Sequence, residues 1–101
     1  MRTELSNHLS QIKKLCIDNK VKTLFAFGSV TNDKFTPESD IDLIVDIDSV
    51  DPLEYSDRYF NLKEELEKLF NRHIDLLEDR ALKNPYLRKE INLTKVLVYG
   101  G

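Results

Sequence analysis

Cysteine, long apolar runs and a basic excess are all scarce or missing in this sequence, and each absence excludes a class of protein. A single cysteine, Cys16, among 101 residues excludes an internal disulfide and a zinc site made of several cysteines. The apolar runs are far shorter than the about 20 residues that a membrane-spanning helix needs. With 15 Lys and Arg against 18 Asp and Glu, the formal charge of −3 argues against strong non-specific binding to nucleic acid.

What remains is the composition of a small folded enzyme or binding module. A hydrophobic fraction of 41% beside 33% charged residues is typical of a globular chain and not of a disordered one. The length fits one domain, residues 1–101, in which any active site is compact and can need a partner to complete it. No secretory signal sequence is evident at the start, so we expect a cytoplasmic location and no membrane association.

The spacing of apolar residues predicts an α/β (α+β) fold with a mixed sheet of about four strands and two long helices packed on one face. Cys16 lies on the apolar stripe of the first helix, which predicts a buried thiol and not a redox group. The order of the strands does not follow from the pattern. The predicted long helices span 4–19 and 51–70, a short helix spans 85–91, and the strands span 21–27, 40–47, 73–77 and 95–99.

Gly28 and Ser29 follow directly after the first predicted strand. Glycine lets a backbone approach a ligand closely, and Ser29 can cap a following helical turn whose free N–H groups attract phosphate. Gly-Ser pairs are also common in ordinary strand-to-helix turns, so the pair alone leaves both interpretations open.

Two aspartates, Asp40 and Asp42, begin the second predicted strand. Side chains at i and i+2 point to the same face of a strand, where two carboxylates can share hard cations through their oxygens. Without a cation their like charges repel one another. A simple polar strand face is the alternative interpretation.

Asp75 lies in the middle of the apolar segment 73–77, where a carboxylate is normally avoided unless it is paired, solvated or bound to metal. If this strand lies beside 40–47, Asp75 converges with Asp40 and Asp42. His73 has the same parity, but a surface histidine is the preferred interpretation. Three carboxylates beside a phosphate-binding turn suggest nucleotidyl transfer from a nucleoside triphosphate. We expect the acidic residues to bind two Mg²⁺ ions.

The stretch 27–30, followed after eight residues by 39–45, resembles the signature of the DNA polymerase beta-like nucleotidyltransferase superfamily. The short chain and the third aspartate resemble its minimal nucleotidyltransferase (MNT) members. The resemblance implies a palm-like fold in which Asp40, Asp42 and Asp75 are catalytic residues and Mg²⁺ ligands. It also implies that Gly28, Ser29 and Ser39 bind the nucleotide and its phosphates.

The MNT resemblance further implies an antitoxin that transfers AMP from ATP to a tyrosine of a HEPN-domain toxin. One departure is that Asn32 and Asp33 replace the usual Arg and Gly, which removes a positive charge near the expected triphosphate. This departure keeps open an MNT-fold antitoxin with weak or no catalysis that acts by binding its partner. A separate alternative is a nucleotidyltransferase acting on a small molecule such as an aminoglycoside.

Overall fold

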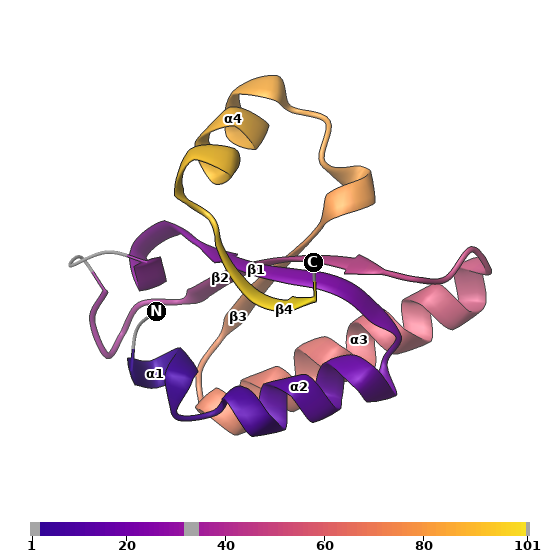
Figure 1. Ribbon diagram of the computed structural model, residues 1–101, viewed down its shortest axis with the longest axis horizontal. Helices are drawn as coiled ribbons and strands as arrows, with labels where there is room; N and C mark the ends of the chain where they lie inside the picture. Colours follow the sequence, from indigo (N-terminus) through magenta and orange to yellow (C-terminus); the bar gives the residue numbers. More distant parts are fainter. Residues whose placement is uncertain (1–2, 32–34, 101) are drawn as a thin grey trace.

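The computed structural model describes residues 3–31 and 35–100, which form a four-stranded sheet with helices on both sides (Figure 1). The described helices are α1 (Thr3–Ser6), α2 (Leu9–Asp18), α3 (Pro52–Phe70) and α4 (Pro85–Thr94), with 3-10 turns η1 (Gly28–Thr31) and η2 (Asp79–Ala81). The strands are β1 (Val21–Phe27), β2 (Ile41–Ile47), β3 (Ile74–Glu78) and β4 (Val96–Gly100). Within these ranges no helix is long and apolar enough to cross a membrane.

The sheet is mixed, with the strand order β3-β2-β1-β4. β1 pairs antiparallel with both β2 and β4, whereas β2 and β3 run parallel. A parallel pair needs a crossover connection, and α3 supplies it between β2 and β3. β2 therefore lies inside the sheet, with a neighbour on each side along its length.

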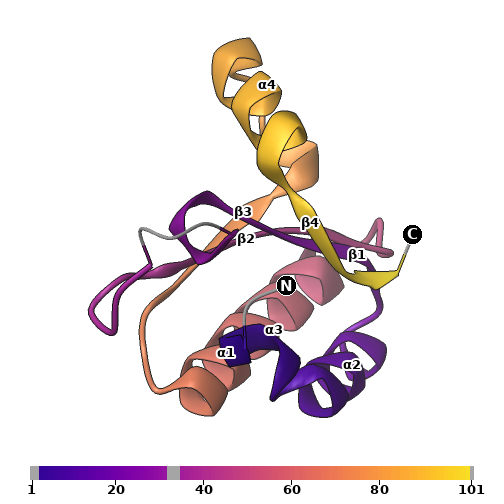
Figure 2. The same ribbon diagram turned by 60° about the vertical axis from the view of Figure 1, so that its left-hand side comes forward.

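One face of the sheet is covered by α2 and α3, which lie side by side beneath the strands in Figures 1 and 2. The alternation in β2 places Leu43 and Val45 on this face, where both are almost fully buried. Cys16 of α2 is also fully buried in this core, and burial raises the pKa of its thiol to about 12. The prediction that two helices pack on one face of the sheet is therefore confirmed, as is the buried thiol.

The predicted helix over 4–19 is wrong as a single element, because the chain turns between α1 and α2. His8 has a non-helical backbone, φ −118° and ψ 13°, and its ring packs edge-on against Phe70 with centroids 5.1 Å apart. The turn lets Leu5 enter the core with 1% of its surface exposed, while Leu9 is left 38% exposed. Packing against α3 thus overrides the apolar periodicity of this segment.

α3 lies within the predicted range 51–70, and local signals set its start and end. Asp51 accepts a hydrogen bond from the backbone N–H of Leu53 (3.0 Å), and Pro52 occupies the first helical position. Glu54, which a capping box would use, instead forms an ion pair with Lys20 (2.6 Å). The helix ends at Asn71 in the left-handed conformation, φ 52°.

The outer edge of β3 is covered by side chains of α3. Glu67 Oε2 accepts from the N–H of Ile74 at 3.2 Å, and the Tyr59 hydroxyl donates to the carbonyl of Leu76 at 2.5 Å. Unpaired edge groups invite association with other strands, so these two contacts close that route.

The opposite face of the sheet carries α4, which stands on the side away from α2 and α3 (Figure 1). Asn84 caps α4 by accepting from the N–H groups of Tyr86 and Leu87. Arg88 ties the helix to η2, because its guanidinium donates to Asp79 Oδ1 (2.6 Å) and to the carbonyl oxygens of Asp79 (2.9 Å) and Leu82 (3.1 Å). The rest of this face, called the open face below, holds the side chains of Phe27, Asp42 and Asp75.

Candidate active site

The parallel pairing of β2 with β3 sets Asp42 directly opposite Asp75. Burial raises the pKa of the half-buried Asp42 carboxyl, and the charges of Asp75 and Asp40 and a side-chain hydrogen bond with Asp75 raise it further. Asp40 and Asp42 therefore interact at one end of the sheet with Asp75, which is distant from them in the sequence. Such a crowded group of negative charges favours the binding of a cation or a proton.

Asp40 lies just before β2 and is in contact with His73. Asp40 Oδ2 is 3.3 Å from His73 Nδ1, and each of the two side chains is 57% exposed. The N–H of Ile41 donates to the carbonyl of His73 at 3.3 Å, which joins the starts of β2 and β3. His73 is a surface residue, which was the preferred interpretation, and it is also a neighbour of the acidic group, as its parity in the strand allowed.

Gly28 adopts a backbone conformation that its position beside Asp42 requires. Its φ is +71°, and a Cβ added there would lie 2.5 Å from Asp42 Oδ2. A side chain at this position would therefore be strained and would displace the carboxylate. The η1 turn begins at Gly28 itself, and Thr31 Oγ1 donates back to the Gly28 carbonyl at 2.7 Å. Ser29 is half-buried in this turn.

Ser39 lies at the end of a closed turn that delivers Asp40 to the site. Its hydroxyl accepts from the N–H of Thr36 (3.0 Å), and its own N–H donates to the Thr36 carbonyl (3.0 Å). Arg72 holds the same turn, since its guanidinium donates to the carbonyl of Ser39 (3.1 Å) and stacks 4.7 Å above the ring of Phe35. The phosphate contact of Ser39 stays a prediction, whereas its contribution to the turn is visible. Sequence reasoning missed Arg72, since no local pattern marks it.

The donor set fits Mg²⁺, because the three carboxylates offer only oxygen ligands, which this ion prefers. Within residues 3–31 and 35–100, no group of three or more His, Cys, Asp or Glu side chains is arranged to hold a metal ion. The mutual contact of the Asp42 and Asp75 carboxyls occupies oxygens that a metal ion would take. Repulsion from the acidic neighbours nevertheless contributes to the raised pKa of Asp42, and a bound divalent cation would relieve this repulsion.

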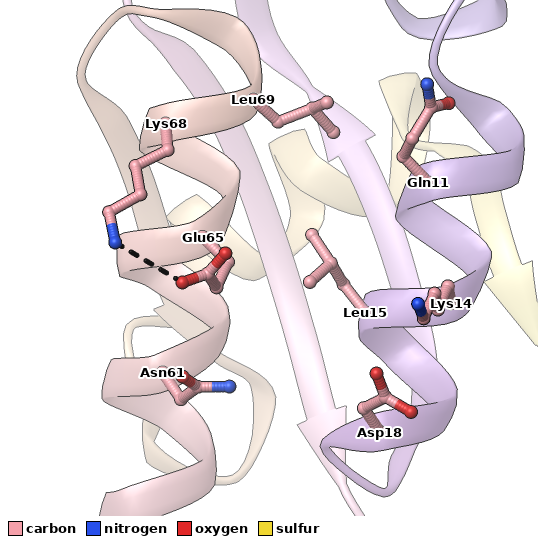
Figure 3. Close-up of a pocket in the computed structure, with 8 residues that line it drawn as sticks. All are labelled: Gln11, Lys14, Leu15, Asp18, Asn61, Glu65, Lys68 and Leu69. Atoms are coloured by element: carbon pink, nitrogen blue, oxygen red, sulfur yellow. Dashed lines mark hydrogen bonds and ion pairs between the residues drawn. The ribbon is translucent and has the colours of Figure 1, made fainter.

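Two depressions differ in their relation to this acidic group. One, of about 360 Å³, lies beside Gly28 and is lined by Phe27, Gly28, Leu87, Glu90, Ile91, Leu93 and Thr94. The other, of about 530 Å³, lies between α2 and α3, and its lining residues are drawn in Figure 3. Lys68 and Glu65 pair with one another across 3.4 Å at its rim, and none of Asp40, Asp42 and Asp75 lines it. The larger depression is thus remote from the candidate chemistry.

Comparisons with known proteins identify the family. The family model described as "Polymerase beta, Nucleotidyltransferase" matches residues 10–101. A Methanocaldococcus jannaschii protein named as a protein adenylyltransferase is 37% identical over 90 residues, covering 88% of this chain and 89% of the relative. The chain therefore belongs to the polymerase beta nucleotidyltransferase family, a family of enzymes. The predicted departure from the family pattern, at Asn32 and Asp33, lies outside the described residues.

Solved structures show the same fold. A protein described as a minimal nucleotidyltransferase is 26% identical and superposes with a TM-score of 0.75, covering 91% of this chain and 90% of that one. The MNT antitoxin chain in a complex with a tri-AMPylated HEPN toxin of Shewanella oneidensis is 21% identical, with a TM-score of 0.66 and coverages of 96% and 73%. The predicted fold class is confirmed by these matches.

Proposed function

We propose that this protein is a Mg²⁺-dependent adenylyltransferase that moves AMP from ATP to a tyrosine of a HEPN-type toxin, and so serves as its antitoxin. The observation that carries the proposal is the register pair of Asp42 and Asp75, with Asp40 interacting with Asp42 and Gly28 packed against the Asp42 carboxylate. Support for the toxin partner comes from the structural likeness to an MNT antitoxin solved with its AMPylated toxin. We expect the reaction to take place in the cytoplasm.

In the proposed reaction the acceptor oxygen attacks the α-phosphorus of ATP. A new bond forms between that oxygen and phosphorus, the bond from phosphorus to the oxygen bridging to the β-phosphate breaks, and pyrophosphate leaves. Asp75 is exposed on the outer strand and is the carboxylate best placed to accept the proton of the acceptor hydroxyl. Asp40 and Asp42 would hold Mg²⁺, which supplies positive charge to the attacking and leaving oxygens.

The turn at Gly28 and Ser29 is the proposed position of the triphosphate. Gly28 lets the backbone of this turn lie close to the Asp42 carboxylate, since even one added carbon would meet that carboxylate at 2.5 Å. Ser39 contributes by closing the turn before Asp40, and a further contact of its hydroxyl with phosphate is part of the proposal. A nucleoside triphosphate held here would present its α-phosphorus to the acidic group.

The test is transfer of label from ATP, with magnesium, to the protein encoded beside this gene. We expect label on a tyrosine of that protein with the wild-type chain and none with Asp40→Asn. Asp48→Asn is the matched control, because Asp48 is an exposed aspartate just beyond the far end of β2, and it should leave transfer unchanged. Absence of transfer by the wild-type chain would overturn the proposal.

One observation favours a second function, inhibition of the toxin by binding alone. The described acidic side chains are not arranged to hold a metal ion as they stand. A chain acting this way would form a tight complex that silences the toxin without ATP. Asp40→Asn would leave such inhibition intact, so the same variant separates the two functions.

A further inference from the structure

The depression beside Gly28 lies between the end of β1 and α4, on the open face of the sheet. Its walls are largely apolar and come from Phe27 of β1 and from Leu87, Ile91 and Leu93 of α4. Its volume of about 360 Å³ is at the lower end of the range of small-molecule sites. We call these residues, with Gly28, Glu90 and Thr94, the α4 pocket.

The α4 pocket adjoins the acidic group through Gly28. This residue lines the pocket and is also the one whose added Cβ would touch Asp42 Oδ2. Gly28 is thus a direct neighbour both of the pocket and of the Asp42 carboxylate.

The strand order separates the two sides of the reaction centre. Asp75, on β3, lies on one side of Asp42, and Phe27 and Gly28, at the end of β1, lie on the other. The proposed triphosphate turn is on the β1 side, so the donor nucleotide occupies that side and the acceptor approaches from the β3 side. The α4 pocket opens on the donor side.

We propose that the α4 pocket binds the base of the donor nucleotide and that the Glu90 carboxylate selects adenine by accepting a hydrogen bond from its 6-amino group. The inference rests on the proposed function, in that the donor is a nucleoside triphosphate. A flat, apolar base fits between the Phe27 ring and the aliphatic side chains of α4, where stacking and burial favour it.

Glu90 is available for this contact. It lines the pocket, and in the described ranges no side chain or backbone group forms a hydrogen bond or ion pair with its carboxylate, whereas its backbone carbonyl accepts from Thr94 Oγ1 at 3.1 Å. An ionised carboxylate only accepts hydrogen bonds, so it favours an amino group over a carbonyl oxygen at the edge of the base. Arg88 keeps this wall in place through its three contacts with the η2 segment.

The decisive experiment compares ATP with ITP, in which a carbonyl replaces the 6-amino group. Calorimetric titration with magnesium should give roughly tenfold tighter binding of ATP to the wild-type chain. Glu90→Gln can donate to the carbonyl as well as accept from the amino group, so the ratio should fall close to one. Glu64→Gln, an exposed glutamate of α3 on the other side of the sheet, is the control and should keep the wild-type ratio.

A second measurement locates the base without depending on its 6-substituent. Ultraviolet crosslinking of 8-azidoadenosine triphosphate should label residues 84–95, and excess ATP should prevent it. Leu93→Ala should weaken ATP and ITP alike without unfolding the chain, because this leucine lines the pocket while 76% of it is exposed.

Several outcomes would overturn the assignment. A ratio that Glu90→Gln leaves unchanged removes the role of Glu90, and label confined to residues 73–80 places the base on the acceptor side. Absence of any nucleotide binding would overturn both this inference and the proposed function. Selective binding with label on α4 but no transfer to an acceptor would leave the pocket assignment standing and overturn only the proposed transfer.

Discussion

The two faces of the sheet are built from the same strands, but one holds the apolar core and the other holds the candidate active site. On the face beneath α2 and α3, Leu43 and Val45 are almost fully removed from water. On the open face, Asp42 directly precedes Leu43 in the sequence; burial raises the pKa of its carboxyl, and two other carboxylates raise it further. The covered face contributes stability, whereas the open face gives some of it up, because like charges held together oppose folding. Substitutions on the two faces should therefore change different measurements.

The largest expected effect is on the open face. Asp42→Asn should lower nucleotidyl transfer by about 10²–10³-fold, the range seen when one preorganised charge-stabilising group is removed from an active site. The melting temperature should stay unchanged or rise, because the substitution removes a repelled charge. Transfer assays and thermal unfolding on the same preparation check both parts. A variant that loses activity because it unfolds would contradict the separation of the faces.

The neighbouring residue should give the reverse result. Leu43→Ala, at a site only 1% exposed, should reduce the free energy of unfolding by about 2–5 kcal/mol, since it leaves a cavity under the sheet. Denaturant titration measures this loss. Where the variant is still folded, its affinity for ATP should equal that of the wild type, and a specific loss of affinity would show that the faces are coupled.

Gly28→Ala should affect both measurements moderately. The left-handed φ of +71° predicts a cost of about 1–2 kcal/mol for any side chain. The new Cβ would also displace the Asp42 carboxylate, so transfer should fall more than this stability loss alone explains. Parallel unfolding and transfer measurements check this, and full activity in a destabilised variant would contradict the close approach of the two residues.

The smallest effect is expected at the edge of β3, where Glu67 accepts from the Ile74 N–H. This hydrogen bond, and then the one from Lys63, lower the pKa of Glu67 below its ordinary value of 4.5. A lowered pKa in the folded state gives stability that is present above about pH 4.5 and is lost as the pH falls through the folded value. Glu67→Gln should therefore be destabilised by about 0.2–1 kcal/mol at pH 7 and by less near pH 3. Unfolding titrations at both pH values test this, with Glu64→Gln as the control.

Much of this arrangement could be predicted because it is encoded locally. The alternation of β2 fixes which face Asp42 joins, and Asp51 with Pro52 fixes where α3 begins. The break before α2 could not be predicted, because it depends on how Leu5 and His8 pack against residues distant in the sequence. The contact of Arg72 with Ser39 likewise joins residues 33 positions apart. The contacts of Arg88 are closer in sequence, at six to nine positions, but no local pattern marks them.

The candidate site divides in the same way. Asp40, Asp42 and Asp75 could be named from their positions within strands, but only the observed parallel register brings Asp75 opposite Asp42. The α4 pocket had no signal of its own, since Leu87 and Ile91 have the spacing of any amphipathic helix. Their relation to Gly28 arises only when α4 is placed over the open face.

The parallel pairing of β2 with β3 also bears on when the site comes into being. β1 and β2 meet as neighbours in sequence, but Asp75 reaches Asp42 only after the whole of α3 has crossed the sheet. Contacts across such a long loop form late, because closing the loop costs entropy before pairing returns it. A chain still emerging from the ribosome can place Asp40 and Asp42 in the sheet before Asp75 has been added. The acidic group is therefore complete only once α3 and β3 have joined the sheet, and the site cannot act before that stage of folding.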